Sequence, residues 1–203
     1  EIQKNNPEVQ YIAKPLKGSG GYNTNLLNNQ PQLQLNCDEK LIVQEYIEGI
    51  NLSSSVLASE NEAENIVNSR LLTQHDFEKN SQFKYVGNIL PLTEKSILAP
   101  VKNTDAINRE MADTSEKLIR KFELIGSNGV DFILNKNGLY VIEINPRIQG
   151  TFECVQQALG INMLEAHIKA CQNEIIAIDK AKYYSYKKII YSPKTVKYEK
   201  IDL

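Results

Sequence analysis

The chain has 203 residues, of which 41% are hydrophobic and 24% charged, as is usual for one globular core or two small lobes. Its 25 acidic and 23 basic residues give a net charge of −2, which offers no argument for a nucleic-acid partner. No apolar run approaches the roughly 20 residues that cross a bilayer, and the polar opening Glu1–Asn6 is unlike a secretory signal. We therefore expect a cytoplasmic protein without a membrane partner.

The cysteines and histidines give no catalytic pattern. Cys37, Cys154 and Cys171 lack metal-ligand spacing, so we expect reduced thiols in the cytoplasm. The sequence pairs neither His75 nor His167 with a cysteine. We expect the first histidine to be solvated in a polar tip between strands and the second to pack at the edge of the core.

The first predicted strand, Val9–Lys14, ends at Pro15 and leads into a loop with three glycines in the four positions Gly18–Gly21. Glycines let the backbone approach a ligand closely and leave N–H groups free to cradle an anion. Lys14 and Lys17 flank this loop with positive charge. A plain flexible hairpin loop is the alternative.

The middle of the chain predicts a loop or poor helix over Asn23–Asn36 and then a series of strands. The predicted strands are Leu41–Ile47, Leu52–Ala58, Ile66–Gln74 and Phe83–Leu90. A polar tip, His75–Ser81, separates the last two. Lys84 is either an exposed strand lysine or a phosphate contact, and we favour exposure because lysines are usually solvated.

Helical signals dominate the second half. The clearest helix is Thr104–Phe122, with Thr104 or Asp105 as its cap. Two shorter helices are predicted around 152–159 and 163–171, the first ended by Gly160. A last strand is predicted at Lys188–Ser192.

Between these helices lies a predicted hairpin with one acid in each apolar strand, Asp131 in Val130–Leu134 and Glu143 in Leu139–Ile144. A three-residue loop, Lys136–Gly138, would place the two acids opposite each other on one face. A two-residue loop would place them on opposite faces.

Opposed acids repel unless a cation lies between them, and carboxylate oxygens suit a divalent cation. Asn145 and Arg147 follow at two-residue steps, so both share the face of Glu143. Two acids, an amide oxygen and a guanidinium on one face predict a site for phosphates bound through Mg²⁺. Acids that are merely solvated near strand ends are the alternative.

These elements occur in an order that resembles the ATP-grasp superfamily, over Val9 to about Cys171. The match rests on Lys14, the glycine-rich loop, the strand Val43–Ile47, Asp131 and the motif Glu143–Arg147. The resemblance is closest to archaeal predicted ATP-dependent carboligases. Residues 145–149 are similar to the corresponding motif of biotin carboxylase and of the large subunit of carbamoyl phosphate synthetase.

The resemblance implies an α+β fold, in which two α+β lobes with antiparallel sheets enclose a nucleotide cleft. Residues 1–48 would form the small lobe with its glycine-rich lid, 49–174 the large lobe with the metal site, and 175–203 a C-terminal extension. Because an internal-looking strand begins so early and no methionine precedes it, we also expect an N-terminal domain in the intact protein.

The resemblance also implies residue roles, beginning with the nucleotide. Lys14 would contact the ATP phosphates, and Lys84 would match a second phosphate-contacting lysine of the family. Ser19, Gly20 and Gly21 would form a mobile lid over the phosphates. The adenine would be held by Glu45 and by the backbone of Tyr46 and Ile47. Where relatives carry an acid for the ribose, this chain has Asn51 or Ser53.

For the reaction itself, the resemblance implies that Asp131, Glu143 and Asn145 hold one or two Mg²⁺ ions, with Mn²⁺ as a substitute. Arg147 would be the catalytic residue, steadying an acyl phosphate and a tetrahedral intermediate.

The implied activity is that of an ATP-dependent carboxylate ligase, which passes the γ-phosphoryl group to a small carboxylate and lets a nucleophile such as an amine displace phosphate. Such chemistry needs no side-chain nucleophile, in agreement with the cysteine and histidine pattern. A nucleotide-binding module without ligase activity is the alternative, and an oligomer is compatible with either.

Overall fold

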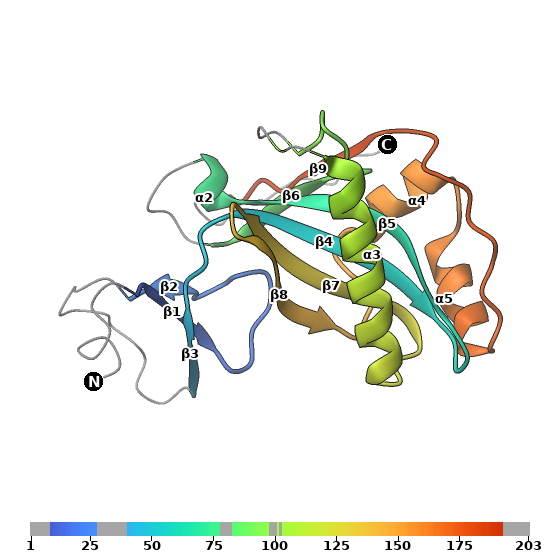
Figure 1. Cartoon of the computed structure of the whole chain (residues 1–203), viewed down its shortest axis with the longest axis horizontal. Coiled ribbons are helices and arrows are strands. Elements are labelled where there is room, and N and C mark those ends of the chain that lie inside the picture. Colours follow the sequence, from blue (N-terminus) through green and yellow to red (C-terminus); the bar gives the residue numbers. More distant parts are fainter. Residues whose placement is uncertain (1–8, 28–39, 78–82, 98–100, 102, 193–203) are drawn as a thin grey trace, which may run out of the picture.

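The computed structural model describes residues 9–27, 40–77, 83–97, 101 and 103–192. Near the N-terminus three strands form a small antiparallel sheet in the order β2-β1-β3. Its strands are β1 (Tyr11–Pro15), β2 (Asn25–Leu26) and β3 (Leu41–Glu45). Figure 1 shows this sheet at the left, beside the larger part of the molecule.

Six strands form a larger antiparallel sheet in the order β8-β7-β4-β5-β6-β9. They are β4 (Ile50–Ala58), β5 (Ala63–Thr73), β6 (Tyr85–Leu90), β7 (Gly126–Asn135), β8 (Gly138–Asn145) and β9 (Ser185–Lys188). The helices are α2 (Gln74–Phe77), α3 (Thr104–Lys121), α4 (Phe152–Leu159) and α5 (Met163–Cys171). The α+β class predicted from the sequence is confirmed.

The larger sheet is covered on both faces, as the alternation along β4 shows. Leu52 and Val56 pack in a cluster with Met111 and Ile119 of α3, which crosses one face of the sheet in Figure 1. Leu57, whose side chain points the other way, packs in a second cluster with α4 and α5. Farther along that second face, the side chains of β4 are polar and face a cavity. This cavity is the candidate site.

Several local predictions need correction. The segment 23–36 was predicted to be a loop or poor helix, but β2 forms within it and pairs with β1; residues 28–36 lie outside the described part. Asn103, rather than Thr104 or Asp105, caps α3, because its side-chain oxygen accepts a hydrogen bond from the backbone N–H of Ala106 at 3.1 Å.

The C-terminal strand was predicted too late. It occupies 185–188, not 188–192, because its partners on β6 set its position: Leu90 pairs with Ser185 and Gly87 with Lys188. The predicted division of the chain at 48 and 174 remains a prediction. In the described ranges no helix is long and apolar enough to span a bilayer.

Candidate functional site

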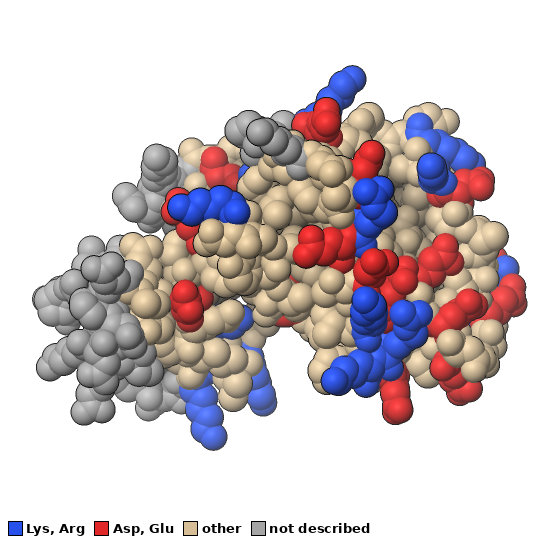
Figure 2. All heavy atoms as spheres, in the orientation of Figure 1, with Lys and Arg blue, Asp and Glu red and all other residues tan. Residues whose placement is uncertain are grey.

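A cavity of about 390 Å³ lies between the small sheet and the larger sheet, and Figure 2 shows the surface hollowed between these two parts. Its walls come from β1, the glycine-rich loop, the end of β3, and strands β4, β5, β7 and β8. Volumes of roughly 300 to 1,000 Å³ are usual for small-molecule sites. The candidate site is therefore assembled from segments far apart in the sequence.

The two acids of the β7–β8 hairpin are opposed, as predicted, but through a different backbone geometry. Asn135 pairs with Gly138, so the loop has two residues rather than three. Phe132 pairs with Val141 and Asp131 with Glu143. One residue of β8, Ile142, is thus left over as a β-bulge, and this extra residue brings the acids back into register.

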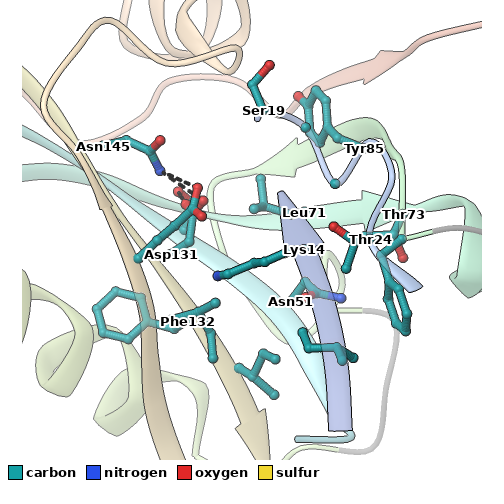
Figure 3. A pocket seen from close by; sticks show the side chains of 18 of the residues that line it. Lys14, Ser19, Thr24, Asn51, Leu71, Thr73, Tyr85, Asp131, Phe132 and Asn145 are labelled. Carbon is teal, nitrogen blue, oxygen red and sulfur yellow. Dashed lines mark hydrogen bonds between the residues drawn. The ribbon is translucent and has the colours of Figure 1, made fainter. Parts of the chain in front are cut away.

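Asn145 connects the two carboxylates. Its Nδ2 donates to Asp131 Oδ2 at 3.1 Å and to Glu143 Oε1 at 3.2 Å, and Figure 3 shows its side chain directed at Asp131. Its Oδ1 accepts a hydrogen bond from Arg147 Nη2 at 3.1 Å. The predicted acids, amide and arginine are therefore brought together on one face.

This donor set fits a hard divalent cation. The two carboxylates are hard ligands, and Mg²⁺ is commonly bound by one or two carboxylates together with substrate phosphates and water. Asn145 turns its nitrogen toward the acids and its oxygen toward Arg147, so it would add an oxygen ligand only after its amide group rotates. Among the described residues no group of three or more His, Cys, Asp or Glu side chains forms a self-sufficient metal cage. Two carboxylates leave most coordination positions of such an ion open to phosphate oxygens and water.

The electrostatics of Asp131 support the same conclusion. Burial raises its pKa from 3.8 to about 6; the hydrogen bond from Ser53 Oγ, at 2.6 Å, lowers it, and the charge of Glu143 raises it. Asn145 and Arg147 offset the charge only in part. A cation beside Asp131 would lower this raised pKa, because it stabilises the ionised form of the carboxyl group.

Behind the acids lies a buried hydrogen-bonded group that the sequence did not reveal. Gln149 Nε2 donates to Ser53 Oγ at 3.0 Å, and Ser55 Oγ donates to Gln149 Oε1 at 3.1 Å. The Gln149 amide lies against Gly129, where an added Cβ would meet Nε2 at 1.8 Å. Consecutive serines inside an apolar strand were the available signal, because buried hydroxyls need partners.

The glycine-rich loop closes another side of the cavity, and Ser19, Gly20 and Gly21 all line it. Gly20 and Gly21 have φ of 61° and 70°, a left-handed conformation that side chains disfavour. A Cβ on Gly21 would lie 1.9 Å from the carbonyl oxygen of Phe83. Lys14 of β1 also lines the cavity, and Figure 3 shows its side chain extending into it.

Another part of the cavity wall is aromatic. Glu45, the last residue of β3, and the next two residues, Tyr46 and Ile47, line the cavity; their contact with an adenine remains a prediction. The Tyr46 ring lies 5.6 Å from the Phe83 ring, and burial, together with nearby acids, raises the Tyr46 pKa. Flat aromatic walls beside exposed backbone suit a planar base.

Asn51 and Ser53 are the two residues expected near a ribose. Both Asn51 and Ser53 line the cavity, but the Ser53 hydroxyl donates to Asp131. A ribose contact by Asn51 remains a prediction.

Lys84 and His75 are placed differently from expectation. Lys84 is not an exposed strand residue: it is half-buried and stands just before β6. It is not among the residues lining this cavity, and its ammonium lies 3.3 Å from the centroid of the Tyr191 ring. Its phosphate contact remains a prediction, and the next residue, Tyr85, lines the cavity instead. His75 is not a solvated tip residue: it stands in α2, lines the cavity and stacks on Phe83 at 5.3 Å.

His167 packs against the start of β7, as predicted, with Nδ1 accepting a hydrogen bond from Ser127 N at 2.9 Å. The structure also pairs it with a cysteine, since Cys171 Sγ lies 3.8 Å from His167 Nε2. The sequence missed other cavity residues because they belong to no motif. Examples are Thr24, Leu71, Thr73, Asp76, Tyr85 and Thr151.

Comparison with known proteins agrees with this geometry. The family model of the ATP-grasp domain matches residues 1–151. An uncharacterized protein of Methanocaldococcus jannaschii is 30% identical over 75% of this chain and 34% of its own length. The tyramine–L-glutamate ligase of the same organism is 29% identical over 83% of this chain and 44% of its own.

Solved structures show the same fold. The biotin carboxylase of Campylobacter jejuni, in complex with an ATP analogue, superposes with a TM-score of 0.68 at 17% identity, over 91% of this chain and 42% of the other. The biotin carboxylase domain of Hydrogenobacter thermophilus 2-oxoglutarate carboxylase, in complex with MgADP, ADP and bicarbonate, gives 0.67 at 18% identity, over 91% and 42%. This chain spans less than half of each relative named here. It belongs to the ATP-grasp family.

Proposed function

We propose that this chain is the nucleotide-binding part of an ATP-dependent carboxylate ligase that works through an acyl phosphate and joins the carboxylate to an amine. The observation that carries the proposal is the cluster of Asp131, Glu143 and Asn145 beside Arg147, in a cavity whose wall also carries the rings of Tyr46 and Phe83. Such a cavity can hold a base against the aromatic rings and phosphates beside the acids.

Each group of residues has a distinct part in this proposal. Lys14 supplies positive charge to the phosphates, and the glycine-rich loop supplies backbone N–H groups. Asp131, Glu143 and Asn145 would hold Mg²⁺, which supplies charge compensation on the transferred phosphoryl group. Arg147 is exposed, and its guanidinium donates hydrogen bonds to Asn145 Oδ1 and to the Ile148 carbonyl. Its other N–H groups remain as donors for an acyl phosphate.

Chemistry and one relative support a proposal for the substrate class. A carboxylate is a poor electrophile until it is phosphorylated, after which an amine can displace phosphate. The ligase from Methanocaldococcus jannaschii is named for an amine and an amino acid. We therefore propose an amino-acid-like carboxylate and an amine acceptor, with ATP as the energy source.

The test is ADP release by the intact protein with Mg-ATP across a panel of amino acids and amines. Asp131→Asn should reduce Mg²⁺-dependent ADP release at least 100-fold, because it removes a cation ligand. Asp113→Asn, at an exposed position of α3, should leave it unchanged. Nucleotide binding without ADP release on any pair would support the binding-module alternative, and equal turnover in both variants would refute the proposed site.

A further inference from the structure

The C-terminal strap, defined here as residues 185–191, lies along the edge of the larger sheet. Its strand β9 pairs with β6, and Ile189 N donates to Val86 O at 2.7 Å just beyond the strand. At Gly87 a Cβ would meet the carbonyl oxygen of Lys187 at 1.9 Å, so this edge of β6 accepts the strap only with glycine there. Figure 1 shows β9 beside β6. The strap therefore packs closely against β6, the strand that begins at the cavity.

One residue of that strand is bound from two sides. The backbone N–H of Tyr85 donates to Gly20 O in the glycine-rich loop at 2.9 Å. The carbonyl oxygen of Tyr85 accepts a hydrogen bond from the Tyr191 hydroxyl, also at 2.9 Å. The loop and the strap thus hold the same residue, although about 170 positions separate them in the sequence.

A second contact couples the same segments. The Lys84 ammonium lies 3.3 Å from the centroid of the Tyr191 ring and 5.9 Å from that of Tyr22, which directly follows the glycines. A cation over the face of an aromatic ring is attracted by its quadrupole. Lys84 therefore contacts the ring of Tyr191 in the strap and lies near the ring of Tyr22 in the loop.

The strap also reaches the loop that follows the metal-site motif. Lys187 Nζ donates to the carbonyl oxygen of Gly150 at 3.1 Å and forms an ion pair with Glu153 at the start of α4. Gly150 lines the cavity. The strap thus supports the cavity both at the glycine-rich loop and at the loop that follows the metal-site motif.

The glycine-rich loop depends on this anchorage. Its other backbone hydrogen bonds are internal, from Tyr22 N to Ser19 O and from Thr24 N to Gly21 O. Within the described residues, the bond from Tyr85 to Gly20 is the backbone hydrogen bond that connects residues 18–23 to the larger sheet. If Tyr85 moves, the loop loses that connection.

We propose that Tyr191 is a positioning residue that holds the glycine-rich loop closed over the nucleotide by fixing Tyr85. This inference rests on the proposed function, in which the loop covers ATP. The strap orders the docking surface in advance, so that closing the loop costs less conformational entropy. Tyr191 itself touches no reacting atom; its effect is on retention of the nucleotide.

The experiment compares three variants of the intact protein. Tyr191→Phe removes the hydroxyl but keeps the ring over Lys84, Tyr191→Leu removes both contacts, and Tyr186→Phe is the control on β9. The Tyr186 side chain is 55% exposed and its hydroxyl has no hydrogen-bond partner among the described residues. Hydrogen exchange of the Tyr85 amide, which bonds to Gly20, reports loop opening directly.

We expect Tyr85 amide exchange about fivefold faster in Tyr191→Phe, as for the loss of one hydrogen bond, and faster still in Tyr191→Leu. The dissociation constant of a non-hydrolysable ATP analogue with Mg²⁺ should rise by about the same factor. In turnover, KM for ATP should rise while kcat stays within about twofold, a split that general loss of folded protein would not produce.

Two results would overturn one claim each. If the analogue binds the wild type, yet Tyr191→Phe matches Tyr186→Phe in both exchange and affinity, the strap does not hold the loop. If the wild type does not bind the analogue, the proposed function fails; Tyr85 exchange in the same variants then still decides whether Tyr191 anchors the loop.

Discussion

Asp131 and Glu143 face each other across the β7–β8 ladder because one surplus residue in β8 compensates for a turn that is one residue short. The pairing places two carboxylates on a single face of the sheet, with Asn145 bridging them. Without the bulge the same sequence would turn one acid away from the other. The candidate metal site therefore depends on a backbone irregularity as much as on the acids.

The first prediction concerns stability against pH in the absence of divalent cations. The folded-state pKa of Asp131, about 6, exceeds its ordinary value of 3.8, so the folded state binds this proton more tightly. The resulting contribution to the free energy of unfolding is fully present below about pH 4 and is lost as the pH rises through 6. It amounts to at most about 3 kcal/mol, at about 1.4 kcal/mol for each of two pKa units.

Asp131→Asn should remove this part of the pH dependence. Urea unfolding in EDTA at pH 4.5 and pH 7 should show a smaller drop in unfolding free energy for the variant than for the wild type. The matched control Asp113→Asn should keep the wild-type drop. An equal drop in unfolding free energy for the wild type and Asp131→Asn would show that burial does not raise the pKa of this carboxyl group.

A second prediction separates the shape of Arg147 from its charge. Arg147→Lys keeps the positive charge but loses the planar fork of donors, which reaches Asn145 Oδ1 and the Ile148 carbonyl at once. Turnover should fall by about 10- to 100-fold, while affinity for a non-hydrolysable ATP analogue changes by less than about threefold. An equal loss in both quantities would assign Arg147 to nucleotide binding instead.

Gly129 provides a third prediction, because its missing side chain makes room for Gln149. In Gly129→Ala the new methyl group would displace the Gln149 amide, which lies 1.8 Å from the position of that Cβ. Ser53 and Ser55 would lose buried partners, at a cost of about 1–3 kcal/mol in unfolding free energy. Thermal and urea unfolding measure the loss.

The control for this substitution is Gly18→Ala. A Cβ at Gly18 would meet its nearest neighbour, Pro15, at an ordinary 3.6 Å. Its unfolding free energy should stay within about 0.5 kcal/mol of wild type. A Gly129→Ala protein as stable as this control would show that Gln149 relocates without loss.

Much of the framework follows from sequence pattern because local rules determine it. The apolar periodicity of 104–122 predicts α3 nearly residue for residue, since a helix that buries one face repeats every 3.6 residues. Acids inside apolar strands likewise identify Asp131 and Glu143. Burial of charge is costly for Asp131, whereas Glu143 is exposed.

The missed features depend on contacts between distant segments. The bulge at Ile142 has no signature in its own residues, and the position of β9 is set by pairing with β6 across about 100 residues. The pairing of Ser53 with Gln149 and the stacking of His75 on Phe83 arise only when the sheet is assembled. Such non-local choices lie outside the reach of local patterns.

The most direct test of the central claim is Mn²⁺ binding, followed by electron paramagnetic resonance in the presence of a non-hydrolysable ATP analogue. Mn²⁺ accepts the same hard oxygen ligands as Mg²⁺ and is visible spectroscopically. The account predicts saturable binding to the wild type and to Asp113→Asn, weakened at least tenfold in both Asp131→Asn and Glu143→Gln. Undiminished Mn²⁺ affinity in these two variants would show that the opposed carboxylates do not hold the cation.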